Sequence, residues 1–153
     1  MRPARASGRP ASPGFRSWWP DVAPRIIRFA GEGFDLTFEA RGGYLRAQVD
    51  AARDNFEISL GYWQQIAREC HERGSTHVLV VENIPEAGNP LDMERLIDSV
   101  IALGFQNIKV AFVDLFDEHL QAMEHGEILA RERGIVGRVF AQESDAERWL
   151  RYG

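Results

Sequence analysis

The chain has 153 residues, of which 44% are hydrophobic and 27% charged, and its formal net charge is −5. These values are typical of one globular domain with a sizeable core, and runs such as Val78–Val81 are far shorter than the roughly 20 apolar residues of a membrane-spanning helix. The single cysteine, Cys70, excludes an internal disulfide and a four-cysteine zinc site. We therefore expect a cytoplasmic protein without an integral membrane segment.

The charge is unevenly distributed along the chain. Residues 1–28 carry a net charge of +5 and the remainder −10. The first segment is rich in Arg, Pro, Ala and Ser and has no apolar periodicity, so we expect a disordered basic tail and transition over residues 1–28, followed by one domain over 29–153. Trp18 and Trp19 lie in the transition, where they pack onto the domain or contact another chain. An acidic domain argues against nucleic-acid binding.

The domain begins with two alternating runs. Apolar and polar residues alternate over Phe34–Ala40 and again over Tyr44–Asp50, and Arg41-Gly42-Gly43 lies between them. This pattern predicts a β-hairpin that has one solvent-exposed face and lies near one edge of a sheet.

A helix should follow, from Asn55 or Ser59 to Arg73. Its apolar residues step by four and three positions, which places them along one side. The stripe that we predict from this spacing comprises Phe56, Leu60, Trp63, Ala67 and Cys70.

The central part of the chain predicts a βαβ unit. Strands are expected at Thr76–Val81 and Lys109–Val113, with a loop over Asn83–Pro90 and a helix over Leu91–Leu103 between them. Asn89 is placed to cap this helix and Pro90 to occupy its first position.

Three glycines, Gly74, Gly104 and Gly134, follow predicted helices at intervals of 30 residues. Glycine suits the left-handed position just past a helix end, so this period indicates successive helix–loop–strand units.

The last third predicts a helix over Asp117–Arg133, a strand over Gly137–Ala141 and a final helix opened by a capping box at Ser144. Phe116, Leu120, Met123 and Ala130 are the expected inward residues of the longer helix. The fold class is therefore α/β, with the order ββαβαβαβα. We expect a mixed, mostly parallel sheet of about five strands with helices mainly on one face.

Acidic residues gather where the predicted strands end. Asp50, Glu82 and Asp114 each close a strand, and Asp117, Glu118 and His119 follow just beyond the last of these. Ligands of open α/β sheets bind at the carboxyl ends of strands, so one interpretation is a divalent-metal or acid–base site. The other is the ordinary preference of Asp and Glu for loops and for the first turns of helices.

Other catalytic and cofactor motifs are missing from the sequence. It contains no His-Glu-x-x-His pattern, no phosphate-binding glycine loop ending in Lys, and no Gly-x-Ser-x-Gly elbow. Gly31-Glu32-Gly33 opens no helix, and the lysine that a response-regulator receiver needs after its last strand is missing. We expect neither catalysis nor a cofactor.

The segments KVAFVD (Lys109–Asp114) and GRVFAQESDAERWL (Gly137–Leu150) resemble the last third of the STAS/SEC14-like, SpoIIAA-like proteins of bacteria. This resemblance implies a small sheet with helices mainly on one side, and a role in protein regulation or in binding a small apolar ligand. The phosphorylated serine of the anti-sigma-factor antagonists would fall within Asn89–Asp92, which contains neither Ser nor Thr, so the serine phosphoswitch is not expected.

Our first functional hypothesis is a non-catalytic regulatory or scaffold module that binds a protein partner of unknown identity. Its contact surface would be the loop and the start of the helix that follows, with the binding residues Glu82, Asn83, Pro85, Glu86, Asn89 and Asp92. One alternative is a protein that binds a lipid or another apolar small ligand. The other alternative is a weak metal or acid–base site at the strand ends.

Overall fold

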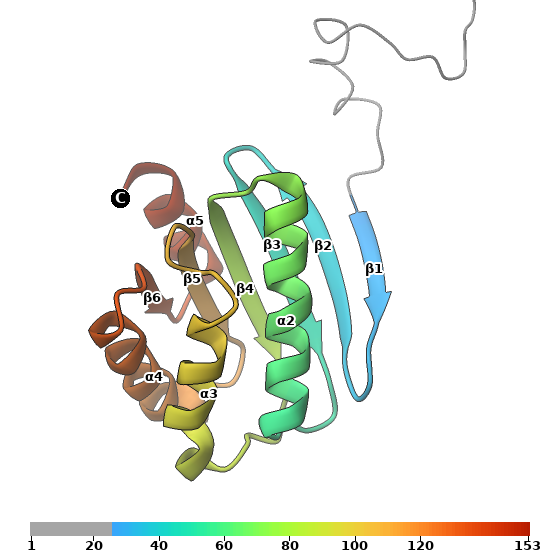
Figure 1. Ribbon diagram of the computed structural model, residues 1–153, viewed down its shortest axis with the longest axis vertical. Coiled ribbons are helices and arrows are strands. Elements are labelled where there is room, and N and C mark those ends of the chain that lie inside the picture. The colour runs from blue at the N-terminus through green and yellow to red at the C-terminus, as the bar shows by residue number, and fades with distance from the viewer. Residues whose placement is uncertain (1–25) are drawn as a thin grey trace, which may run out of the picture.

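The computed structural model describes residues 26–153 and has an α/β fold, in which a six-stranded sheet is flanked by helices (Figure 1). The mixed, mostly parallel sheet that the sequence predicts is thereby confirmed. The strands are β1 (Ile26–Ala30), β2 (Asp35–Arg41), β3 (Tyr44–Asp50), β4 (His77–Asn83), β5 (Lys109–Asp114) and β6 (Gly137–Phe140). The α-helices of the described residues are α2 (Phe56–Arg73), α3 (Met93–Ile101), α4 (Leu120–Glu132) and α5 (Glu143–Tyr152).

The order of the strands in the sheet equals their order in the chain, β1-β2-β3-β4-β5-β6. The first three strands are antiparallel, and β3 to β6 run parallel to one another. The sheet has one strand more than the about five expected, because Ile26–Ala30 pairs with β2 although we placed residues up to 28 in the tail. The rest of the predicted tail, including Trp18 and Trp19, lies outside the described residues.

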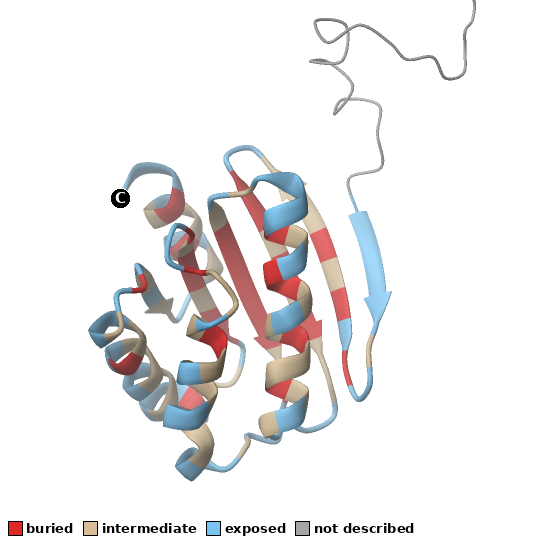
Figure 2. Ribbon diagram, in the orientation of Figure 1, coloured by how far each residue is buried: buried red, intermediate tan, exposed pale blue. Residues whose placement is uncertain are grey.

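Helices cover both faces of the sheet unequally. Helices α2 and α3 pack with α4 on one face, and α5 alone covers β4 and β5 on the other (Figure 1). The central strand β4 is therefore buried on both sides, whereas all five residues of the edge strand β1 are exposed (Figure 2).

Helix α2 begins and ends as its sequence predicts. The Asn55 side chain accepts a hydrogen bond from the Ile58 backbone N–H, and Gly74 closes the helix with a left-handed φ of 67°. The buried face, however, is offset from the predicted stripe. It comprises Ser59, Tyr62, Ile66, Ala67 and Cys70, whereas Phe56, Leu60 and Trp63 are only half-buried.

The other helices bring one confirmation and two corrections. Asn89 caps a short 3₁₀ turn, Pro90–Asp92, that leads into α3. In α4 the buried residue is Leu129, while Leu120, which we expected inside, is 45% exposed. The predicted capping box at Ser144 is wrong, because the N-cap of α5 is Gln142, two residues earlier.

Polar contacts attach α5 to the sheet. The Arg46 guanidinium of β3 lies 2.6 Å from a carboxylate oxygen of Glu143, and this ion pair lowers the pKa of Glu143. The Lys109 ammonium donates to the Trp149 carbonyl at 3.0 Å and lies over the indole ring. Within residues 26–153, no helix is both long enough and apolar enough to cross a membrane.

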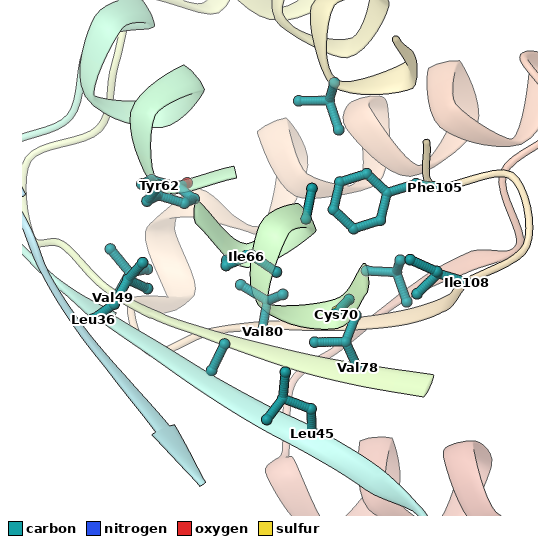
Figure 3. Packing of buried hydrophobic residues seen from close by; sticks show 14 of the residues in the cluster. Leu36, Leu45, Val49, Tyr62, Ile66, Cys70, Val78, Val80, Phe105 and Ile108 are labelled. Atoms are coloured by element: carbon teal, nitrogen blue, oxygen red, sulfur yellow. The ribbon is translucent and has the colours of Figure 1, made fainter. Parts of the chain in front are cut away.

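The larger core lies between α2 and the sheet. Ile66 and Cys70 of α2 pack against Val78 and Val80 of β4, and Phe105 extends this cluster from beyond α3 (Figure 3). All five side chains are at most 1% exposed. Cys70 thus serves as a small buried hydrophobe.

We expect the Cys70 thiol to be unreactive in the folded protein. Burial raises its pKa to about 12, and a rise of about three units cuts the reactive thiolate about 1,000-fold. Alkylation by iodoacetamide at about pH 8 should therefore be slower by about that factor than in denaturant. A native rate within about tenfold of the denatured rate would contradict the described burial.

The same pKa shift predicts a loss of stability in alkali. The unfolded thiol ionises above about pH 9 while the folded thiol keeps its proton, so the free energy of unfolding falls by up to about 1.4 kcal/mol per pH unit until about pH 12. The variant Cys70→Ala, measured over the same range, should lack this contribution.

Candidate functional site

The candidate site begins at the carboxyl ends of the two central parallel strands. Glu82 of β4 is the register partner of Asp114 of β5, so their side chains emerge at the same edge of the sheet. Both are carboxylic acids, yet Glu82 is only 5% exposed and Asp114 only 8%. Charged groups are rarely buried to this extent unless they have partners.

The turn after β5 supplies a histidine to this pair. His119 lies at the end of the 3₁₀ turn Asp117–His119, and its Nδ1 is 2.9 Å from Asp114 Oδ2. The other oxygen of Asp114 accepts a hydrogen bond from the Phe116 backbone N–H at 2.8 Å. Because a carboxylate accepts, we place the imidazole proton on Nδ1. The other ring nitrogen, Nε2, has no hydrogen-bond partner among residues 26–153.

Helix α2 and the segment before it complete the cluster. The Tyr62 hydroxyl donates a hydrogen bond to Glu82 Oε2. Asp54 Oδ1 accepts from the Ser59 hydroxyl at 2.6 Å and from the Asn55 backbone N–H at 2.9 Å. The acidic cluster, as we call it, thus consists of Asp54, Ser59, Tyr62, Glu82, Asp114 and His119.

Burial controls the protonation of the cluster. Desolvation, reinforced by the charge of Asp54, raises the pKa of Glu82 well above its ordinary value, and desolvation also raises the pKa of Asp54 and of Tyr62. Glu82 is therefore the neutral member, and its carboxyl group hydrogen-bonds to Asp114. In residues 26–153 no Lys or Arg pairs with Asp54, Glu82 or Asp114.

An apolar cavity of about 150 Å³ adjoins the acidic cluster between the sheet and helices α2 to α4. Asp54, Tyr62 and Glu82 form its polar wall. The rest of the lining is mainly apolar and aromatic and includes Trp63, Leu96, Val100, Phe105, Phe112 and Ala130.

A second hollow, of about 560 Å³, adjoins the first. It shares Asp54, Ser59 and Glu82 with the apolar cavity and is also lined by His119 and Asn89. The apolar cavity therefore adjoins a more polar space beneath the loop that precedes α3, and the two also share Met93, Leu96, Ala122 and Met123.

The structure brings together part of the set of strand-end residues that the sequence singled out. Glu82, Asp114 and His119 each offer a metal-ligand atom, and these atoms lie within 4.8 Å of one another. Asp50 instead accepts hydrogen bonds from Asn83 and Gln48, and Asp117 and Glu118 are exposed.

The predicted protein-contact residues lie in different environments. Pro85, Glu86 and Asn89 are exposed on the loop, and Asp92 is half-buried at the start of the helical segment. The Asn83 amide donates to Asp50 at 2.7 Å. Glu82 belongs to the acidic cluster and offers almost no surface to a partner.

Sequence reasoning missed Asp54, Ser59 and Tyr62. Asp54 lies beside the N-cap of α2, and its backbone N–H donates to the Glu86 carbonyl at 2.9 Å, which ties it to the loop after β4. A stripe centred on Ser59, Tyr62 and Ile66 has the same helical spacing as the predicted one and could have identified two of these residues.

Comparison with known proteins does not add a family to this description. The chain matches no protein-family model and no curated protein.

Proposed function

We propose that this chain binds a small, mainly apolar molecule in the cavity beside the acidic cluster. The observation that carries this proposal is the cavity itself, whose volume is about 150 Å³ and whose walls are mostly aliphatic and aromatic. An apolar cavity of about this size in another protein accommodates benzene. Ligand sites of this kind are mostly apolar and have a few polar groups that fix orientation.

The acidic cluster supplies such orienting groups. Its side chains are held by contacts from α2, β4 and the turn after β5, so their positions are fixed before a ligand arrives. In this proposal they orient a ligand and change no bond of it. The resemblance to STAS/SEC14-like proteins supports the same proposal, because one role that it implies is apolar-ligand binding.

Filling the cavity should weaken binding. Ala130 of α4 lines the cavity, and Ala130→Leu would place three further carbon atoms there. We expect the affinity for benzyl alcohol, a neutral probe, to fall at least about tenfold by isothermal titration calorimetry, while stability changes by less than about 3 kcal/mol.

A matched control is Ala102→Leu, because Ala102 is an exposed residue just after α3 and does not line the cavity. This variant should bind the probe as the parent does. Equal affinity of the parent and Ala130→Leu, or no binding by the parent, would count against the proposal.

A second candidate function is the binding of a divalent cation. Glu82, Asp114 and His119 favour it, since a carboxylate–carboxylate–imidazole set suits Zn²⁺ or Mn²⁺. We expect Zn²⁺ to raise the melting temperature of the parent but not of His119→Gln, and Asp117→Asn, which changes an exposed neighbour, should behave as the parent. An identical melting temperature with and without the ions would dismiss this candidate.

The protein-partner hypothesis stays a prediction. The exposed loop supports it, and Leu91, at 88% exposure, adds an apolar side chain to the residues expected there. Glu82 is withdrawn from that surface because it is buried.

A further inference from the structure

We propose that the ligand of the cavity is a small organic cation, such as a primary alkylamine that carries an aromatic ring, whose ammonium group lies against Asp54 and Glu82. This inference rests on the proposed function and adds the charge and chemical class of the ligand. Its basis is the sign of the charge at the inner wall of the cavity.

The inner wall of the cavity contains few positively charged groups. The acidic cluster contains three carboxyl groups, those of Asp54, Glu82 and Asp114, and within the described residues none of them pairs with Lys or Arg. His119 is the one basic side chain of the cluster. Glu82 is neutral, so the negative charge near this wall is that of Asp54 and Asp114. An anionic head group placed here would be repelled by this charge in a poorly solvated space, whereas a cation would be attracted to it.

A free acceptor atom in the cavity wall supports the same conclusion. Asp54 Oδ1 is occupied by Ser59 and Asn55, but its Oδ2 has no hydrogen bond within residues 26–153. A primary ammonium has three N–H donors and no acceptor, so it complements this oxygen, whereas a carboxylate has only acceptors.

The charges at the other side of the cavity do not reverse this preference. Glu127 and Arg138, of α4 and β6, also line it. The Arg138 side chain is exposed and its guanidinium lies 5.4 Å from the Phe140 ring centroid, so water screens its charge. The buried wall therefore decides which head group is accepted. A fatty acid, one reading of the lipid alternative, is disfavoured.

Three probes that share one ring test the inference directly. Benzylamine, benzyl alcohol and benzoate would be titrated into the full chain at neutral pH with EDTA present, and binding would be measured by calorimetry. We expect benzylamine to bind at least about tenfold tighter than benzyl alcohol, and benzoate to bind weakest, because hydrogen bonds to charged groups are the stronger ones. Benzoate binding as tightly as benzylamine would overturn the inference and leave the cavity proposal standing. Binding of none of the three would remove both.

Asp54→Asn adds a test at residue level. This nearly isosteric change should reduce the preference for benzylamine over benzyl alcohol to less than about threefold. Asp50→Asn is the matched control, since Asp50 lies at the same edge but lines neither hollow, and it should keep the full preference. An undiminished preference in Asp54→Asn would overturn the placement of the ammonium group. If Asp54→Asn does not fold, the probe series on the parent protein still decides the question.

Discussion

Replacing Phe105 with alanine should lower the free energy of unfolding by about 3–5 kcal/mol, as removal of a fully buried aromatic ring generally does. Phe105 is 1% exposed and packs edge-on against Trp63, with ring centroids 5.5 Å apart. It also lines the ligand cavity, so the variant should have a larger cavity as well as a weaker core. Urea denaturation measures the first effect, and titration with naphthalene, which should bind only the variant, measures the second.

Phe56→Ala is the control for this prediction. Phe56 is also an aromatic residue of the same region, but it is half-buried and lies under the Arg95 guanidinium, 3.6 Å from the ring centroid. Its loss should cost only about 1 kcal/mol. If both variants lost the same free energy, Phe105 would not hold the central packing position described above.

Replacing Glu82 with glutamine should stabilise the protein at neutral pH. The folded protein keeps Glu82 protonated, because burial raises its pKa, whereas the unfolded chain releases the proton above about pH 4.5. Folding must therefore take up a proton, and stability falls as the pH rises from that value toward the folded pKa, by up to about 1.4 kcal/mol per pH unit. Glutamine needs no proton, accepts from Tyr62 and donates to Asp114 as the neutral acid does.

The expected result is a stability difference that depends on pH. Chemical denaturation in EDTA should show Glu82→Gln and the parent equally stable at about pH 4 and the variant increasingly more stable up to about pH 7. A variant that is less stable at neutral pH would mean that Glu82 is ionised in the folded state. Asp50→Asn, at the same edge of the sheet but outside the cluster, provides the comparison for a carboxylate in another environment.

The fold could be predicted from the sequence in those segments where the hydrophobic pattern fits only one type of secondary structure. Alternation over Phe34–Ala40 and Tyr44–Asp50 predicted β2 and β3, and the glycine stops at Gly74, Gly104 and Gly134 were correct because each adopts a positive φ. The stripe on α2 was offset because Trp63 and Leu60 look more apolar than Tyr62 and Ser59. The structure buries the latter two, and their hydroxyls reach the carboxyl groups of the cluster.

The candidate site likewise contains residues whose positions could be predicted from the sequence and residues whose positions could not. Glu82 and Asp114 could be placed together in advance, because residues that end neighbouring parallel strands meet at one edge of the sheet. Asp54 could not, since its position depends on the backbone contact between the segment before α2 and the loop after β4. The cavity was also beyond sequence reasoning, because it depends on how closely three helices pack rather than on the pattern of any one.

The sequential arrangement of β1 to β6 bears on how the chain acquires its structure during synthesis. Each strand that leaves the ribosome finds its sheet neighbour already made, so the growing chain can add one strand at a time without waiting for a distant segment. The inner wall of the cavity comes from β4, β5 and α2, but its outer helix α4 and the edge strand β6 follow them in the chain. The binding site is therefore completed only after β6 has been synthesised.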